Sequence, residues 1–237
     1  MWIQRRGRAI RRGKGISVDS QPFIIGIGGS HSGAGKTTVA EALLKSLTQG
    51  VKGSRGQGVK KTKINKTTHS LEPLNPRTLE PCNTSWGAIK YTKTAIYTSI
   101  VDDPEILTQE GKDTQRLLNA GAENVLWVQS PAEELKEVLP LAVSRLSHLR
   151  GIIIEGNSAI EFLKPDIVIF IFGKGSESLK KSAIKVMAMA DIILFQEEPS
   201  IKLPERAKKF KVSLSSKSGL DECMNYIRAC LSTDRGY

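Results

Sequence analysis

Apolar residues along the chain gather in short runs rich in β-branched side chains, and polar stretches separate these runs. Runs of this length and composition are typical of strands buried on both faces, as in a parallel sheet. The pattern therefore predicts strands at residues 23–27, 87–89, 125–128, 151–154, 167–172 and 192–195, with a weaker strand at 211–214.

Between these runs, hydrophobic residues recur every three or four positions, which is the spacing of one helix face. The segment Ser130-Pro131-Ala132-Glu133 has the sequence of a capping box, with proline in the first helical position, and it supports one of these helices. Gly121 is expected to end another. The predicted helices lie near residues 39–47, 114–120, 135–146, 179–190 and 220–231.

The alternation of strands and helices predicts the fold class. It indicates an α/β protein with a doubly wound, mainly parallel sheet and helices on both faces. The composition, with 39% hydrophobic residues, is that of an ordinary globular protein and allows a continuous core. We expect a single domain of this kind over residues 21–237.

The net charge of +11 is concentrated in two segments. Residues 1–20 hold six Lys or Arg and one Asp, and residues 50–85 hold seven Lys or Arg and two Glu. Neither segment interleaves aromatic residues with its basic ones, which argues against a nucleic-acid partner. The second segment is rich in Gly, Thr and Pro and lacks apolar periodicity. We interpret the first as a basic tail and the second as a flexible basic insertion.

The sequence also bears on location. The longest unbroken apolar run has six residues, at 167–172, whereas about 18 are needed to span a bilayer. The basic first twenty residues contain no apolar stretch of the kind found in secretory signals. The three cysteines, an odd number without a CxxC pair, do not suggest a disulfide framework. We therefore expect a cytoplasmic protein without a membrane partner.

Residues 28–38 read GGSHSGAGKTT and lie directly between the first predicted strand and the first predicted helix. This context indicates a phosphate-binding loop, in which backbone N–H groups and the helix N-terminus face a polyphosphate. Lys36 adds a positive charge, Thr37 can ligate Mg²⁺, and Ser30 stands where the strict motif has glycine. We expect nucleotide contacts from Gly29, Ser32, Gly33, Ala34, Gly35, Lys36, Thr37 and Thr38.

Two other nucleotide-binding classes are disfavoured. The chain has no G-x-G-x-x-G, which argues against a dinucleotide fold. His31 stands five residues before Lys36, where one branch of phosphate-loop ATPases carries a second lysine. Because histidine does not supply a permanent charge, dimer-coupled ATPases of that partitioning type are disfavoured, and we expect His31 to be exposed on the loop.

A magnesium ion held by Thr37 needs further oxygen ligands, and a carboxylate at the end of a buried strand commonly orients one. Glu155, which ends a predicted strand, is the first choice as a metal ligand. Asp113 is the second, although it is also expected to cap the 114–120 helix. Asp102 and Asp103 rank third, as turn residues. We assign Lys36, Glu155 and Asp113 as the catalytic residues.

Several stretches together point to a family. Residues 111–113 read GKD, residues 120–122 read AGA, and the strand at 151–154 is followed by Glu155-Gly156. With the phosphate loop and a strand containing Lys90, this order resembles the molybdopterin-guanine dinucleotide biosynthesis protein B family. The Lys-His stretch of that family would fall at residues 90–94, which read KYTKT here.

The resemblance implies a small GTP-binding accessory protein, usually a homodimer, that supports attachment of a guanine nucleotide to molybdopterin. It implies Mg²⁺ with GTP, weak nucleotide hydrolysis, a molybdopterin-type substrate and a cofactor-biosynthesis enzyme as partner. ATP is kept open as the nucleotide. We expect Lys90 and Lys112 to contact the second substrate.

Two alternatives stay open. The spacing from Gly29 to Lys36 is also similar to that of dethiobiotin synthetase and cobyrinic acid amidating enzymes, which implies ATP-dependent activation of a carboxylate or carbamate. In that case Lys90 would steady the carboxylate and phosphoryl oxygens. The other alternative is a non-catalytic nucleotide-binding scaffold whose basic segments recruit an acidic partner.

Base recognition is the least defined feature. Residues 190–196 end where related GTPases carry Asn-Lys-x-Asp, and they contain neither the Asn nor the final Asp. Residues 212–220 resemble the Ser-Ala-Lys loop of the same GTPases. Without a carboxylate to accept the guanine N1 and N2 protons, base selectivity must come from backbone groups or be weak.

Overall fold

The computed structural model describes residues 21–48, 85–173, 178–214, 216 and 219–233. Their centre is an eight-stranded sheet in the order β3-β4-β2-β5-β1-β6-β7-β8, in which every neighbouring pair is parallel except β3 with β4. The strands are β1 (Phe23–Gly29), β2 (Trp86–Lys93), β3 (Ser99–Val101), β4 (Val125–Ser130), β5 (Gly151–Glu155), β6 (Ile167–Phe172), β7 (Ile192–Phe195) and β8 (Lys208–Lys211).

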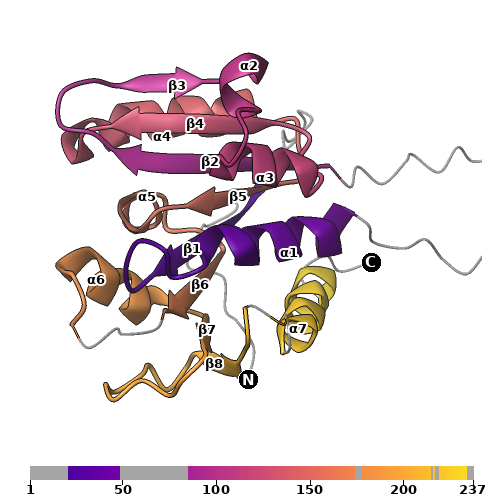
Figure 1. Cartoon of the computed structure of the whole chain (residues 1–237), viewed down its shortest axis with the longest axis vertical. Coiled ribbons are helices and arrows are strands. Elements are labelled where there is room, and N and C mark those ends of the chain that lie inside the picture. Colours follow the sequence, from indigo (N-terminus) through magenta and orange to yellow (C-terminus); the bar gives the residue numbers. More distant parts are fainter. Residues whose placement is uncertain (1–20, 49–84, 174–177, 215, 217–218, 234–237) are drawn as a thin grey trace, which may run out of the picture.

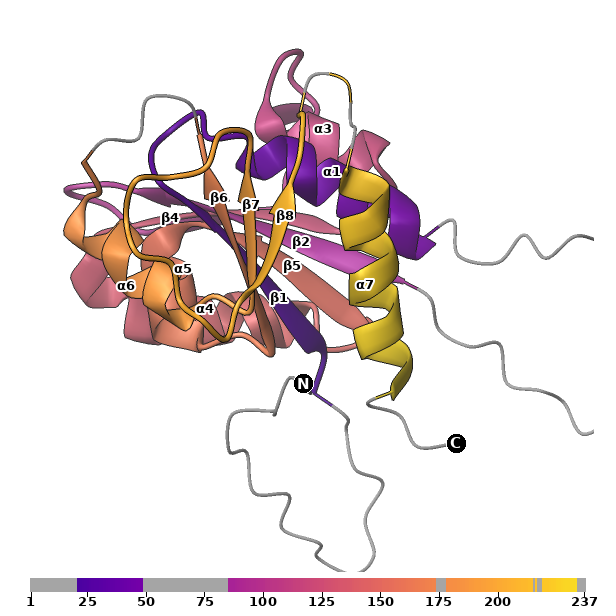
Figure 2. The same cartoon turned by 90° about the horizontal axis from the view of Figure 1, so that it is seen from below.

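Helices cover both faces of the sheet (Figures 1 and 2). One hydrophobic core joins α1, α3 and α7 to one face, and a second core joins α4, α5 and α6 to the other. The helices are α1 (Lys36–Thr48), α2 (Pro104–Leu107), α3 (Asp113–Asn119), α4 (Leu135–Arg145), which follows the 3₁₀ turn η1 (Ala132–Glu134), α5 (Asn157–Leu163), α6 (Lys181–Met189) and α7 (Leu220–Thr233).

The predicted fold class is confirmed. Most strands of the sheet are buried on both faces, and β6 is buried at all six positions, which explains why they could be recognised as continuous apolar runs. The strand order places β1 in the interior of the sheet, between β5 and β6. The phosphate loop that follows β1 therefore lies at the middle of the sheet's carboxyl edge, where open α/β sheets bind ligands.

Three local predictions need correction. Ser130 does not cap a helix: it is the last residue of β4, its buried hydroxyl has no hydrogen-bond partner among the described residues, and a 3₁₀ turn precedes α4. Asp113 is the first residue of α3 and not its cap, because its carboxylate is drawn to Lys90. The weak strand predicted at 211–214 lies earlier, at β8. The short elements β3, α2 and α5 were not predicted.

The basic tail at 1–20 and nearly all of the insertion at 50–85 lie outside the described residues, so both interpretations remain predictions from sequence. The described chain leaves α1 at Thr48 and enters β2 at Trp86. Within the described ranges, no helix has the length and apolar content needed to cross a membrane.

Candidate functional site

The phosphate loop connects β1 to α1, and its start is held by Asn157, the first residue of α5. The Asn157 amide nitrogen donates to the Gly29 carbonyl at 2.9 Å, and its oxygen accepts from the Gly29 N–H at 3.0 Å. The Ser30 N–H donates to the Ile171 carbonyl of β6 at 2.9 Å. Neighbouring elements on both sides of β1 thus hold the start of the loop.

Two glycines shape the rest of the loop. Gly33 and Gly35 have φ angles of +81° and +96°, in a region that residues with a Cβ rarely adopt. At Gly35 a Cβ would also lie 2.2 Å from the Leu214 Cδ1, so the segment after β8 packs directly against the loop.

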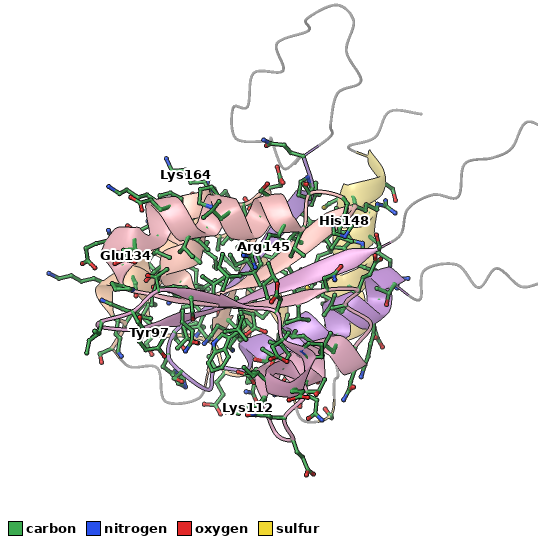
Figure 3. The ribbon with its side chains drawn as sticks, turned by 90° about the horizontal axis from the view of Figure 1, so that it is seen from above. Tyr97, Lys112, Glu134, Arg145, His148 and Lys164 are labelled. Carbon is green, nitrogen blue, oxygen red and sulfur yellow. The ribbon has the colours of Figure 1, made fainter. Side chains whose placement is uncertain are left out.

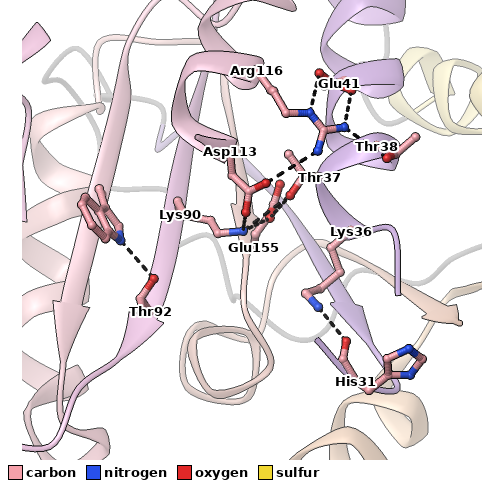
Figure 4. A network of polar contacts seen from close by, with 11 residues as sticks. His31, Lys36, Thr37, Thr38, Glu41, Lys90, Thr92, Asp113, Arg116 and Glu155 are labelled. Atoms are coloured by element: carbon pink, nitrogen blue, oxygen red, sulfur yellow. Dashed lines mark hydrogen bonds and ion pairs between the residues drawn. The ribbon is translucent and has the colours of Figure 1, made fainter. Parts of the chain in front are cut away.

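Lys36 begins α1 and points back into the loop. Its ammonium donates to the His31 carbonyl at 2.9 Å (Figure 4). Burial lowers the pKa of Lys36 most, and the neighbouring Lys90 charge lowers it further, against the opposing effect of Glu155 and Asp113. The ammonium therefore lies inside the loop in a position from which it can exchange a carbonyl for a phosphate oxygen.

A second group of side chains surrounds the Lys90 ammonium (Figure 4). The ammonium donates to Asp113 Oδ2 at 2.5 Å and to Glu155 Oε2 at 2.8 Å, and it lies 3.5 Å from the Thr37 hydroxyl. The Thr37 hydroxyl donates to the same Glu155 oxygen at 3.0 Å. Three of the residues predicted for metal binding or catalysis thus meet around one lysine.

Strand register brings this group together. Lys90 on β2 pairs directly with Glu155 on β5, and Glu155 pairs on its other side with Ile27 on β1. Residues in direct register on parallel strands project from the same face of the sheet. Here it is the face covered by α1 and α3, which carry Thr37 and Asp113.

The charges in the group support one another. Burial acts to lower the pKa of Lys90, but the Glu155 and Asp113 carboxylates outweigh it, and the pKa is raised. Burial acts to raise the pKa of Asp113, but hydrogen bonding and attraction to Lys90 outweigh it, and the pKa is lowered. Both groups are therefore held in their charged forms at neutral pH.

Arg116 connects α3 to α1 beside this group. Its guanidinium makes two hydrogen bonds to the Glu41 carboxylate, at 3.1 and 2.9 Å, and one to the Thr38 hydroxyl at 3.2 Å. The Glu41 hydrogen bonds are the main reason that the pKa of Arg116 is raised. Asp113, one turn before Arg116, lies 3.6 Å from the same guanidinium.

A cleft of about 660 Å³ opens above these side chains. Lys112 (labelled in Figure 3) does not line it: this exposed residue precedes α3. Its ammonium lies 5.9 Å from the centre of the Trp127 ring. Ala34 and Glu155 are buried beneath the cleft surface. The predicted site residues that do line it are Gly29, Ser32, Gly33, Gly35, Lys36, Thr37, Thr38, Lys90 and Asp113.

The residues present fit a magnesium ion. The Glu155 side chain is 1% exposed, and its Oε1 is buried without a hydrogen-bond partner among the described residues. An oxygen in that condition is costly unless a cation or donor approaches it. Asp102 and Asp103 lie elsewhere: Asp102 pairs with Arg145 (labelled in Figure 3), and Asp103 caps α2.

Sequence reasoning missed Asn157 and Arg116 and misplaced His31. The His31 ring is half-buried: its Nδ1 lies 2.9 Å from the Ser30 hydroxyl, and it fills the space where a Cβ on Gly173 would fall. Asn157 directly follows the Glu155-Gly156 pair, and this position in the sequence could have identified it as a residue of the site. The Ser-Ala-Lys-like loop is described only in part, since residues 215, 217 and 218 lie outside the described ranges.

Comparison with known proteins places the fold. No family model and no curated protein matches the chain. Among solved structures it is similar to HypB from Helicobacter pylori in complex with nickel, with a TM-score of 0.51 and 13% identity over 92% of this chain and 90% of that one. It also matches a LAO/AO transport system kinase, with a TM-score of 0.46 and 14% identity over 90% of this chain and 61% of that one.

The likeness to HypB, at 13% identity, concerns the fold alone. Together with the sheet order, it shows that the chain shares the α/β fold of HypB, with a mostly parallel sheet and helices on both faces. The narrower resemblance to the molybdopterin-guanine dinucleotide biosynthesis proteins is not confirmed and remains a prediction.

Proposed function

We propose that this chain binds a nucleoside triphosphate together with Mg²⁺ and hydrolyses it slowly, with GTP as the first choice of nucleotide. The observation that carries the proposal is the loop between β1 and α1. There the Lys36 ammonium is turned into the loop against the His31 carbonyl, and Thr37 lies beside the buried carboxylate of Glu155. This is the arrangement that phosphate-loop chemistry requires.

The loop's own groups divide the work. Backbone N–H groups at the start of α1 and the helix dipole favour a negatively charged phosphate chain. Lys36 exchanges its bond to the loop carbonyl for a phosphate oxygen and neutralises charge there. Arg116, which holds Thr38 and Glu41 in place, keeps the first turn of α1 fixed while this exchange occurs.

Thr37 and Glu155 would hold the magnesium ion, with Asp113 as a further carboxylate nearby. When bound, Mg²⁺ neutralises phosphate charge and polarises the phosphoryl oxygens. The nickel bound by HypB is not part of the proposal, because the side chains around Lys90 offer oxygen ligands, which suit Mg²⁺.

The resemblance in sequence gives this activity its context. We propose an accessory role in guanine dinucleotide formation on a molybdopterin-type substrate, acting as a homodimer with a cofactor-biosynthesis enzyme. The cleft supports a second ligand, because it continues from the phosphate loop past Tyr91, Thr92 and Lys93 at the end of β2. Lys90 borders the same cleft, whereas Lys112 would have to act from outside it.

A nucleotide panel tests the proposal. The full chain is titrated with GTP, GDP, ATP and ADP, each with Mg²⁺ and with EDTA, and melting temperature and binding heat are recorded. A ligand present at 100 times its Kd stabilises the folded state by about 2.7 kcal/mol, which is easily measured. We expect Mg²⁺-GTP to stabilise most. Stabilisation by ATP alone would favour the carboxylate-activating alternative, tight binding without turnover would favour the scaffold, and no stabilisation by any nucleotide would overturn the proposal.

A further inference from the structure

The Lys90 ammonium is surrounded by three side-chain oxygens of the site. It lies 2.5 Å from an Asp113 oxygen, 2.8 Å from a Glu155 oxygen and 3.5 Å from the Thr37 hydroxyl. These three oxygens belong to the side chains that the site offers to Mg²⁺. The positive charge of Lys90 thus lies where the charge of the divalent ion is needed.

Lys90 is the main positive partner of the two carboxylates in this group. Glu155 and Asp113 bring two negative charges into a half-buried space, and Lys90 donates to both. Arg116 makes two hydrogen bonds to the Glu41 carboxylate and lies farther from Asp113, at 3.6 Å, and Lys36 donates to a loop carbonyl. Even with Lys90 in place, the buried Glu155 Oε1 has no hydrogen-bond partner among the described residues, so the group retains capacity for a cation.

We propose that the Lys90 ammonium occupies the divalent-cation position when nucleotide is absent and is displaced from it when the Mg²⁺-nucleotide complex binds. The proposal rests on the proposed function, since it concerns the metal of that same site. Lys90 is then a positioning residue that holds Glu155, Asp113 and Thr37 together in advance and prevents the free ion from binding alone.

The physical basis is competition between two cations for the same oxygens. Mg²⁺ binds oxygen at about 2.1 Å and tolerates few departures from octahedral geometry, so an ammonium between the two carboxylates excludes it. Like charges a few ångströms apart in a partly buried space repel strongly. A nucleotide changes the balance, because its phosphates supply further oxygen ligands to the ion and new acceptors to the released ammonium.

Metal binding without nucleotide tests the idea directly. Mn²⁺ alone is titrated into the wild-type chain, Lys90→Met and Lys93→Met, with bound ion followed by electron paramagnetic resonance. Lys93 lies on the same strand, lines the same cleft and is exposed, so its substitution is a control for lost charge. We expect Lys90→Met to bind Mn²⁺ at least about tenfold more tightly than the other two proteins, a difference of about 1.4 kcal/mol.

Adding Glu155→Gln to Lys90→Met should remove that gain, because the ion then loses its buried carboxylate. Equal Mn²⁺ affinity in Lys90→Met and wild type would overturn the proposal. So would a similar gain in Lys93→Met, which would indicate a general charge effect. The Mn²⁺ titrations contain no nucleotide, so their outcome is independent of the nucleotide panel. Failure of the wild-type chain to bind any nucleotide would refute the proposed function, whereas the role of Lys90 is decided by the Mn²⁺ affinities.

A second measurement uses the wild-type chain and so does not depend on the folding of Lys90→Met. The NH₃⁺ signals of ¹⁵N-lysine-labelled protein are recorded, and that of Lys90 is identified by its loss in Lys90→Arg. We expect this signal to shift when Mg²⁺ and nucleotide are added together, and much less with nucleotide in EDTA. An unchanged signal in protein saturated with Mg²⁺-nucleotide would show that the ammonium is not displaced.

Discussion

Asn157 holds Gly29 by both of its backbone polar groups: the side-chain amide donates to the carbonyl at 2.9 Å and accepts from the N–H at 3.0 Å. Gly29 is the last residue of β1, and Asn157 is the first of α5, 128 positions later. This paired hydrogen bond fixes the point at which the chain leaves the sheet and enters the phosphate loop.

Replacing Asn157 by alanine should therefore make the start of the loop more mobile, while the residues expected to contact phosphate remain in place. Two hydrogen bonds are lost, and each contributes about 0.5–1.5 kcal/mol, so we expect a loss of about 1–3 kcal/mol in stability and a fall in nucleotide affinity. Denaturant unfolding and calorimetric titration measure the two effects. Ser158→Ala, at the next position and lining the same cleft, is the control and should leave both values nearly unchanged.

Lys36→Ala should abolish most triphosphate binding while the fold persists. Within the described part of the chain, the hydrogen bond of this lysine is to a loop carbonyl, so its loss costs little stability, whereas a charged hydrogen bond to phosphate contributes about 1.5–3 kcal/mol. Calorimetry should show more than a tenfold loss of affinity with an unchanged circular dichroism spectrum. Lys45→Ala, an exposed lysine of the same helix, should bind as the wild type does. Full affinity in folded Lys36→Ala would refute the assignment of the phosphate loop.

Glu155→Gln should weaken the Mg²⁺ dependence of nucleotide binding far more than Asp102→Asn does. Glu155 shares its Oε2 with Thr37 and Lys90, whereas Asp102 is exposed and pairs with Arg145. The comparison is affinity with Mg²⁺ against affinity with EDTA in each variant. If Asp113→Asn loses the Mg²⁺ enhancement and Glu155→Gln keeps it, the roles of the two carboxylates are exchanged.

Gly35→Ala should harm the loop more than Gly33→Ala. Both positions have positive φ, but a Cβ at Gly33 meets no described residue within 4 Å, whereas at Gly35 it would collide with Leu214. We expect both variants to lose about 1 kcal/mol of stability from backbone strain and Gly35→Ala to lose more. Denaturant unfolding of the Gly35→Ala/Leu214→Ala double variant tests whether the collision with Leu214 is the cause. Once Leu214 is shortened, adding Gly35→Ala should cost only the backbone strain, so the two single-variant losses should not add.

The buried Cys223 should make the protein less stable in alkali. Burial raises the pKa of this thiol to about 12 from an unfolded value of 9.0, so the unfolded chain ionises first. The contribution of the protonated thiol to the free energy of unfolding is fully present below pH 9.0. As pH rises from 9.0 towards 12, the thiol ionises only in the unfolded chain, so this contribution falls by about 1.4 kcal/mol per pH unit. Unfolding at pH 8 and pH 10.5 should show a smaller decline for Cys223→Ala. Parallel declines in both proteins would contradict this.

The parts of the molecule that the sequence predicted well are contiguous in sequence. The phosphate loop is a single run of residues 28–38, and the strands at 167–172 and 192–195 match β6 and β7 at both ends, because each is an uninterrupted apolar segment. Local patterns suffice where the structure itself is local.

The parts that were missed depend on distant neighbours. Nothing near Lys90 in sequence indicates that β5 lies between β2 and β1, and this order is what places Glu155 beside it. Ser130 has the sequence of a helix cap, yet sheet pairing with Lys93 keeps it in β4. Asp113 likewise leaves its expected capping role for an ion pair across the sheet face.

The direct pairing of Lys90 with Glu155 also discriminates between alternative alignments of β2 and β5. A slip of one residue would place Ile89 or Tyr91 opposite Glu155 and turn the lysine to the other face of the sheet. The carboxylate would then be buried without its cation, at a cost that properly aligned strands avoid. The ion pair therefore favours the native register of β2 and β5 over slipped registers, and the same register assembles the site.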